Sequence, residues 1–307
     1  MSGPVVLAFG GNALLSNPAH PASSEVAARS LAQAVRLLLP GGEGMVLVHG
    51  NGPQVGMILL RIEATRERIP AESLDVLVAE TQGSIGYLLC RALRNSITDR
   101  EIAAVLTQVL VNPEDPGFVH PTKPVGPFYS RDEAGELRAR QGWQMVEAPG
   151  RGWRRVVPSP RPLAVIELHT IADAVGHGHL VIAGGGGGIP VRRTEENLLQ
   201  GVEAVVDKDL TAALLATILQ AHSFVILTDV PHVSADFATG SERRIAGMGV
   251  SEARRRLEAG EFPAGSMGPK VEAAAAYAEV TGHSALITDV ERLEEALAGR
   301  AGTWIDV

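Results

Sequence analysis

The sequence contains a single cysteine, Cys90, among 307 residues. One thiol cannot form an internal disulfide, and Cys90 lies in an apolar-periodic run at residues 84–93. We therefore expect a packed helical residue in a reducing compartment. The apolar run at residues 4–9 is far shorter than the roughly 20 residues that a membrane-spanning helix needs. Together these features predict a cytoplasmic protein.

Basic residues are also fewer than acidic ones: the sequence has 27 Lys and Arg and 35 Asp and Glu, which gives a formal net charge of −8. Binding to a nucleic-acid backbone or an acidic membrane needs a basic surface. We therefore expect neither partner, although a local positive pocket can still bind a small anion. The hydrophobic fraction of 45% and charged fraction of 20% are ordinary for a globular protein and argue against disorder.

Signatures of several common site types are missing. No glycine loop continues into the Gly-Lys-Ser/Thr of a Walker A loop, and Ile189 stands where the run 184–188 would need glycine to complete a dinucleotide-binding pattern. No Ser-His-Asp or Cys-His arrangement stands out. His177 and His179 have no third ligand cluster, so a turn before a strand explains them better than a metal site. We expect no metal held by protein ligands alone.

Short runs rich in Val, Leu and Ile alternate with longer helical patterns. The runs expected as strands are residues 5–9, 45–49, 104–109, 179–183, 224–228 and 284–288. The expected helices are residues 24–39, 74–95, 162–176, 208–220 and 270–281. This alternation predicts an α/β fold in which a mainly parallel open sheet is sandwiched between helices.

Residues 112–161 break this rhythm and are rich in Pro, Gly, Arg and aromatic residues. A structureless loop of this length is improbable in a compact domain. We therefore expect a small protruding lid subdomain, inserted within a single domain of residues 1–307.

Two glycine loops each follow an expected strand: Gly10-Gly11-Asn12-Ala13 and Gly50-Asn51-Gly52-Pro53. Glycine lets the backbone approach a ligand closely and turn its N–H groups inward. Open α/β sheets bind ligands at the carboxyl ends of their strands, which is where these loops fall. The two loops therefore indicate a phosphate-binding site.

Two lysines stand at expected helix starts. In Asp207-Lys208-Asp209, we expect Asp207 to cap the helix, Asp209 to orient lysines and Lys208 to point to the ligand. Lys270 closes Met-Gly-Pro-Lys at the start of another helix. A lysine there opposes the helix dipole, so a bound anion would explain its position. Lysine supplies a compact full charge where the loops supply only dipoles.

In this order and spacing, these motifs resemble the carbamate kinases of the amino-acid kinase superfamily. The matching segments are residues 8–14, 49–56, 81–83, 85–87, 107–109, 121–128, 155–160, 184–190, 201–209, 227–230 and 265–270. The resemblance implies reversible phosphoryl transfer between ATP and carbamate, giving carbamoyl phosphate and ADP, with Mg²⁺. It also implies a homodimer.

The resemblance assigns roles by position. Carbamate and the transferred phosphoryl group would be held by Gly10, Gly11, Asn12, Gly50, Asn51 and Gly52. The catalytic residues would be Lys123, Lys208, Asp209 and Lys270, with Lys123 reaching down from the subdomain. Nucleotide contacts would come from Gly185, Gly186, Asp229 and Met267. Phosphoryl transfer depends on positioning and charge stabilisation, so a missing catalytic His or Ser is expected.

One segment departs from the resemblance. The family usually has Val-Tyr-x-Asn-Phe-Gly beside the nucleotide, whereas this chain has Ser234 and Asp236 in place of the tyrosine and asparagine. Two alternatives remain open. One is another kinase of the superfamily that phosphorylates a small carboxylic acid, which the Lys123 subdomain disfavours. The other is a non-catalytic sensor of carbamoyl phosphate or nucleotide, which the intact lysine set disfavours.

Overall fold

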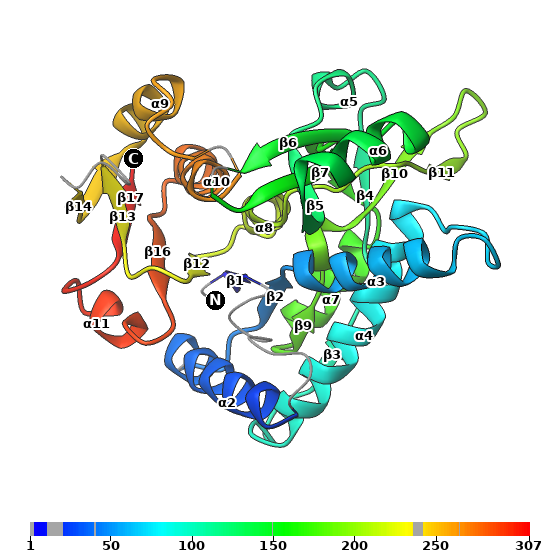
Figure 1. The fold of residues 1–307 in the computed structure, drawn as a ribbon. Helices are drawn as coiled ribbons and strands as arrows, with labels where there is room; N and C mark the ends of the chain where they lie inside the picture. Colours follow the sequence, from blue (N-terminus) through cyan, green and yellow to red (C-terminus); the bar gives the residue numbers. More distant parts are fainter. Residues whose placement is uncertain (1–2, 11–20, 40, 149, 236–241, 264) are drawn as a thin grey trace.

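A computed structural model of the chain describes residues 3–10, 21–39, 41–148, 150–235, 242–263 and 265–307 (Figure 1). Eight strands form its largest sheet: β1 (Val5–Phe9), β2 (Met45–His49), β3 (Ile102–Ala104), β9 (Leu180–Ile182), β12 (Ser223–Thr228), β15 (Gly247–Gly249), β16 (Ala285–Asp289) and β17 (Thr303–Asp306). Their order is β15-β17-β16-β12-β1-β2-β9-β3. All neighbours pair in parallel except β16 and β17.

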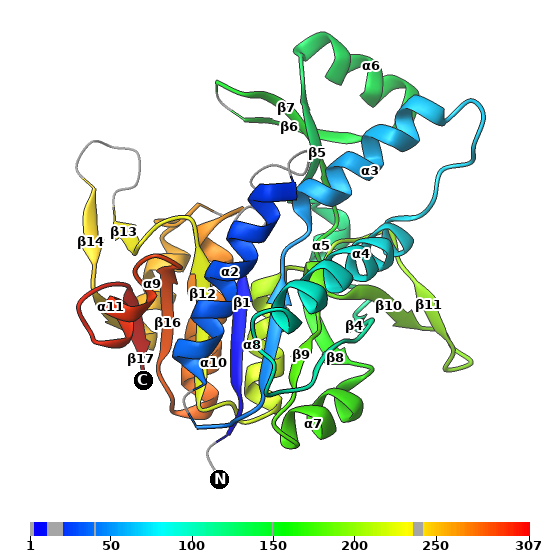
Figure 2. The ribbon, with the colours of Figure 1, turned by 90° about the horizontal axis from the view of Figure 1, so that it is seen from below.

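Helices cover both faces of this sheet (Figure 2). The side chains of Val5, Leu7 and Phe9 pack in one apolar cluster with α2 (Pro21–Leu38), α4 (Leu74–Arg94) and α11 (Leu293–Leu297). Val6 and Ala8 pack in another with α7 (Leu168–Gly176), α8 (Lys208–Ile218), α9 (Val250–Glu258) and α10 (Met267–Thr281). Successive side chains of a strand point to opposite faces, so a strand covered on both sides is apolar throughout. The predicted fold class is confirmed.

Two local predictions were wrong where the chain crosses between sheets. The expected strand 104–109 is divided, because β3 ends at Ala104 and β4 (Gln108–Val111) belongs to a second sheet. The backbone N–H of Thr107 donates to the side-chain oxygen of Gln82 at 2.7 Å, which takes the chain out of the first sheet. That second sheet has the order β11-β10-β4-β8. Its other strands are β8 (Pro162–Val165), β10 (Ile189–Arg193) and β11 (Leu199–Gly201).

The expected helix 162–176 begins instead as strand β8, which pairs antiparallel with β4. Glu167 fixes this arrangement, because its carboxylate accepts the backbone N–H of Gln108 at 2.7 Å. Helix α7 therefore starts only at Leu168. The remaining predicted strands and helices are present with ends shifted by a few residues, and α3 (Gly52–Thr65) was not predicted. Within the described ranges, no helix has the length and apolarity to cross a bilayer.

A three-stranded antiparallel sheet stands clear of the main sheet (Figure 2). Its order is β5 (Lys123–Tyr129), β7 (Gly152–Val157) and β6 (Gln144–Ala148), and α6 (Arg131–Gln141) lies between β5 and β6 in the chain. The short helix α5 (Pro116–Val119) precedes it, and β13 (Val233–Ala235) pairs separately with β14 (Arg243–Ile245). Arginines stack on aromatic rings in and beside the three-stranded sheet, including Arg138 on Trp153 and Arg155 on Trp143, each at 4.5 Å. Such stacking explains how a segment rich in Arg and aromatic residues folds.

The five-glycine run forms a tight turn, η1 (Gly185–Gly187), after β9. Gly187 has φ of +94°, and four of the five glycines have positive φ. A Cβ at Gly185 would lie 2.3 Å from Nε2 of His49, and one at Gly186 would lie 2.1 Å from Nδ2 of Asn51. The run is therefore glycine because other chain segments approach it closely, and a flexible linker is not needed to explain it.

Gly187→Ala should destabilise the chain by more than about 3 kcal/mol, because its Cβ would lie 2.1 Å from the backbone carbonyl oxygen of Val206. Gly282→Ala is the matched control, with φ of +74° and nothing within 4 Å of the new Cβ. It should lose only the roughly 1–2 kcal/mol of left-handed strain. Urea denaturation measures both losses. Equal losses would show that the approach to Val206 does not constrain the turn.

Candidate active site

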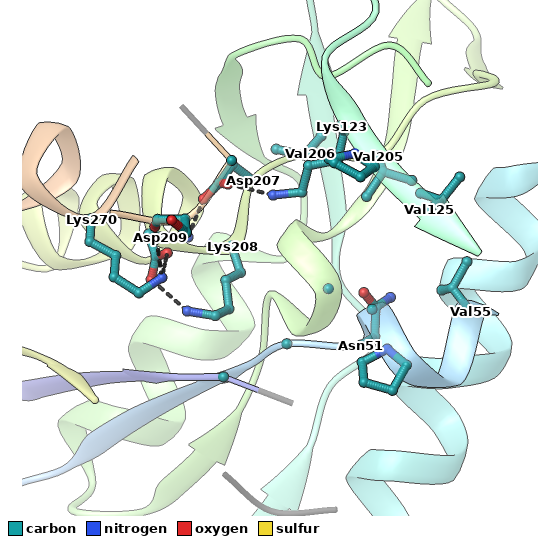
Figure 3. Close-up of a pocket in the computed structure, with 18 of the residues that line it drawn as sticks. Asn51, Val55, Lys123, Val125, Val205, Val206, Asp207, Lys208, Asp209 and Lys270 are labelled. Atoms are coloured by element: carbon teal, nitrogen blue, oxygen red, sulfur yellow. Dashed lines mark hydrogen bonds and ion pairs between the residues drawn. The ribbon is translucent and has the colours of Figure 1, made fainter. Parts of the chain in front are cut away.

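Loops from four adjacent strands meet at the carboxyl edge of the main sheet. The parallel register places Phe9 beside both His49 and Leu227, so the residues that follow these three strand positions lie side by side. The backbone N–H of Gly50 donates to the carbonyl oxygen of Phe9 at 2.9 Å. The turn η1 follows β9 on the other side of β2. These loops surround a cavity of about 280 Å³ (Figure 3).

Most of the predicted site residues line this cavity. They are Gly10, Gly50, Asn51, Gly52, Lys123, Gly186, Lys208, Asp209, Asp229 and Lys270. Gly11 and Asn12 lie outside the described residues, as does Asp236. Gly185 and Met267 are not among the residues that line this cavity. Gly185 lines a second cavity of about 300 Å³, and the partly buried side chain of Met267 packs against the core. Ser234 lies in β13 and is not among the residues that line the first cavity either.

A buried carboxylate holds two of the lysines together. Nζ of Lys208 lies 2.5 Å from one oxygen of Asp209, and Nζ of Lys270 lies 3.1 Å from the other (Figure 3). Burial alone would raise the pKa of Asp209, but the two ammonium groups lower it to about 2. Burial lowers the pKa of Lys208, an effect that Asp209 opposes and Lys270 reinforces. Lys208, Lys270 and Asp209 together carry a net positive charge, which attracts an anion, while Asp229 brings a negative charge to the same cavity.

The third lysine reaches the site from the three-stranded sheet. Lys123 is the first residue of β5, and its Nζ lies 2.5 Å from Oδ2 of Asp207. The other oxygen of Asp207 accepts the backbone N–H of Asp209 at 2.8 Å, so the predicted helix cap is confirmed. Sequence analysis missed the second partner of Asp207. This ion pair connects the three-stranded sheet to the start of α8.

Every lysine in the sequence lines this one cavity. The 27 basic residues comprise 24 arginines and three lysines, at positions 123, 208 and 270. The scarcity of lysine marks the same three residues as the motifs do, without reference to any family. Lysine is a compact point charge, whereas the arginine guanidinium is planar and forked. The composition therefore indicates that these three positions need a point charge.

His49 is a further residue that the sequence did not single out. It ends β2, is 1% exposed, and its Nδ1 lies 3.1 Å from the carbonyl oxygen of Gly50. Burial lowers the pKa of His49 to about 4, and the charge of Lys208 acts in the same direction, against the bond to Gly50. The imidazole is therefore neutral near pH 7, with Nδ1–H donating to Gly50. Through this hydrogen bond to Gly50, His49 helps to fix the backbone of the second glycine loop.

The described part of the chain contains no group of three or more His, Cys, Asp or Glu side chains placed to hold a metal ion. Asp229 lines the cavity, and its Oδ1 accepts the hydroxyl of Thr228 at 3.1 Å. Asp207 and Asp209 are paired with lysines. Mg²⁺ is commonly held by one or two carboxylates together with substrate phosphates. Among the described carboxylates that line the cavity, Asp229 is the one that pairs with no lysine, so it is the side chain that could hold such an ion.

Comparison with known proteins agrees with this geometry. The sequence profile of the amino acid kinase family matches residues 3–289. The carbamate kinase of Thermococcus kodakarensis is 43% identical over 98% of each chain, and the carbamate kinase-like protein YqeA of Escherichia coli is 44% identical over 99% of each. The structure of the carbamate kinase of Giardia lamblia bound to AMP-PNP has a TM-score of 0.88 at 38% identity. It covers 99% of this chain and 98% of that one.

The free energy of unfolding should fall as the pH is lowered from 6.5 towards 4. In this window the unfolded chain protonates His49 whereas the folded chain keeps it neutral, so protonation favours unfolding. The shift corresponds to roughly 3 kcal/mol. Burial also lowers the pKa of His232, which acts in the same direction. Asp209, with a pKa of about 2, contributes only below its ordinary value of 3.8.

Urea denaturation at both ends of this window measures the effect. In His49→Gln the free energy of unfolding should change less with pH than in the parent. In His283→Gln, which alters an exposed position, it should change with pH as in the parent. An unchanged dependence in His49→Gln would contradict the assignment.

Proposed function

The chain belongs to the amino acid kinase family, and on that premise we propose that it is a carbamate kinase. It transfers a phosphoryl group reversibly between ATP and carbamate, giving carbamoyl phosphate and ADP. The observation that carries this proposal is the pair Lys208 and Lys270 on Asp209, beside two glycine loops at the edge of the sheet. Relatives named carbamate kinase that match nearly the whole chain support it.

The lysines supply the electrostatic part of the mechanism. Negative charge spreads over the phosphoryl oxygens during transfer, and the ammonium groups of Lys208 and Lys270 stabilise it in a site that excludes much of the water. Asp209 keeps both groups in place before the substrate arrives. The glycine loops at Gly10 and Gly50 hold carbamate and the transferred group in line. Carbamate is already an anion, so no general base is required.

The nucleotide occupies the side of the cavity that includes Asp229 and Ser266. Mg²⁺, when bound with the nucleotide, neutralises phosphate charge, and Asp229 is the carboxylate available to it. Gly186 lines the same cavity and remains a proposed nucleotide contact, whereas the roles of Gly185 and Met267 remain predictions. Because Ser234 replaces the family's tyrosine, we expect a raised KM for ADP or relaxed choice among nucleotide bases, even though Ser234 is not among the residues that line the cavity.

A coupled assay of ATP formation from carbamoyl phosphate and ADP tests the function. It should include a panel of other acyl phosphates, since a relative named only carbamate kinase-like is as similar as those named carbamate kinase. Turnover of carbamoyl phosphate supports the proposal. Turnover of another acyl phosphate alone would assign a different kinase of the family, and binding without turnover would indicate a sensor.

Lys208→Ala and Lys270→Ala should each lower kcat by roughly 10²- to 10³-fold, the scale for losing a preorganised charge-stabilising donor. Arginine at either position should restore little activity, because its planar fork does not match a point-charge site. Arg254→Ala is the control, since it removes an exposed positive charge that pairs with Glu279 away from the cavity. Values of kcat within about threefold of the parent in both lysine variants would contradict the roles assigned here.

We also propose that residues 112–161 form a lid that closes over the cavity. A small apolar cluster of its own, including Val125, Val157, Leu77 and Val205, attaches the three-stranded sheet to the rest of the molecule. The ion pair of Lys123 makes a second attachment. A small apolar cluster and this partly buried ion pair are few contacts, so the three-stranded sheet can move locally. Closure would exclude water from an acyl phosphate that hydrolyses readily.

Hydrogen exchange tests the lid. Backbone amides of β5, β6 and β7 should exchange more slowly when ADP and carbamoyl phosphate are both present, whereas amides of the buried strand β1 should not change. Equal exchange of the three-stranded sheet with and without ligands would indicate a rigid attachment.

We propose a homodimer joined through the edge of the main sheet. β3 is an edge strand of the main sheet, and Tyr87 and Leu106 nearby are 60% and 56% exposed. Tyr87 and Leu106 line the second cavity together, so the exposed apolar side chains are contiguous. An edge strand flanked by apolar side chains is suited to pairing with another chain.

Sedimentation should show a dimer, and Leu106→Glu should convert it to a monomer. A monomeric parent would contradict the proposal.

A further inference from the structure

Thr81 lies behind the second glycine loop, on α4, and is completely buried. Its hydroxyl donates to the carbonyl oxygen of Val78 at 2.7 Å and accepts from Nδ2 of Asn51 at 2.9 Å. A hydroxyl has one hydrogen and two acceptor sites. Because that hydrogen is used by Val78, Thr81 presents only an acceptor to Asn51. The amide of Asn51 must therefore turn its nitrogen towards Thr81.

The amide oxygen of Asn51 consequently faces the other way. In Figure 3 the oxygen lies on the side of Lys208 and the nitrogen on the side away from it. Asn51 lines the cavity and is only 5% exposed. Within the described part of the chain, its amide oxygen has no hydrogen-bond partner in the protein, whereas its nitrogen has Thr81. The oxygen is not among the buried, unpartnered atoms of this part of the chain, so it is open to the cavity, where it can accept from a ligand that brings a donor.

The turn η1 also packs against the side-chain amide of Asn51. A Cβ at Gly186 would lie 2.1 Å from Nδ2 and 2.8 Å from Oδ1 of Asn51, so the amide packs flat against the glycine backbone. Reversing the amide would place two oxygens together unless Thr81 gave up its bond to Val78. The reversed state therefore has one hydrogen bond fewer, which corresponds to a factor of roughly 2 to 12 in population.

We propose that Thr81 is a positioning residue that fixes the amide oxygen of Asn51 as the acceptor for the amino group of the carbamoyl substrate. The inference rests on the proposed function and names the feature by which the site selects its substrate. The neighbouring lysines and glycine N–H groups are donors that suit phosphate and carboxylate oxygens. Asn51 supplies an uncharged acceptor among them. A methyl group in place of the amino group, as in acetyl phosphate, leaves that acceptor unpaired.

The experiment compares kcat/KM for carbamoyl phosphate and acetyl phosphate, each with ADP, in the parent, Thr81→Val and Thr81→Ser. Valine keeps the shape but removes the hydroxyl. Thr81→Val should lower the ratio of the two kcat/KM values by about tenfold, mainly through loss of carbamoyl phosphate turnover. Thr81→Ser keeps the hydroxyl and should hold the ratio within about twofold of the parent. If Thr81→Val does not fold, Thr81→Cys takes its place, because a thiol is a weaker acceptor.

Thr281→Val is the matched control. It removes a threonine hydroxyl that also donates to a carbonyl one turn earlier, at the far end of α10. It should leave the ratio unchanged. An unchanged ratio in Thr81→Val, or an equal loss with both substrates, would overturn the role of Thr81 while leaving the proposed function standing. A parent that uses acetyl phosphate but not carbamoyl phosphate would overturn the proposed function itself.

Discussion

The site depends on one buried interaction, the carboxylate of Asp209 between Lys208 and Lys270. Two ammonium groups this close would repel each other and lose much of their hydration without a shared partner. One carboxylate is enough to hold them but too little to neutralise them. The remaining positive charge stands beside a cavity, and in the proposed mechanism an anionic substrate completes the balance. On that proposal the same three side chains serve stability and function.

The rest of the fold positions this cluster. Lys208 and Lys270 stand in the first turns of α8 and α10, which pack against each other behind the sheet. Both helices therefore direct their positive ends towards the cavity. The parallel register brings the loops after β12, β1 and β2 to the same edge. The glycine turn η1 packs closely against His49 and Asn51, which fixes the second glycine loop in place.

Sequence patterns predicted what is set locally. Strands 5–9 and 45–49 were recognised because burial on both faces makes them apolar throughout, and Asp207 because a helix cap depends on neighbouring residues. Contacts between distant segments were missed. Thr107 leaves the main sheet for a side chain 25 residues away, and Lys123 meets Asp207 across 84 residues. Neither contact produces a periodic pattern of apolar residues in the sequence from which it could be predicted. The restriction of lysine to three positions was visible in the composition and depends on no contact at all.

The presence of only three lysines allows a direct measurement. In a chain labelled with [ε-¹³C]lysine, all side-chain lysine signals come from the cavity and can be assigned with single Lys→Arg variants. Titration with carbamoyl phosphate in the presence of ADP should shift the Lys208 and Lys270 signals together. In Asp209→Asn the two signals should lose this common response. If the substrate turns over while neither signal shifts, the lysines do not contact the phosphoryl group and the central claim is wrong.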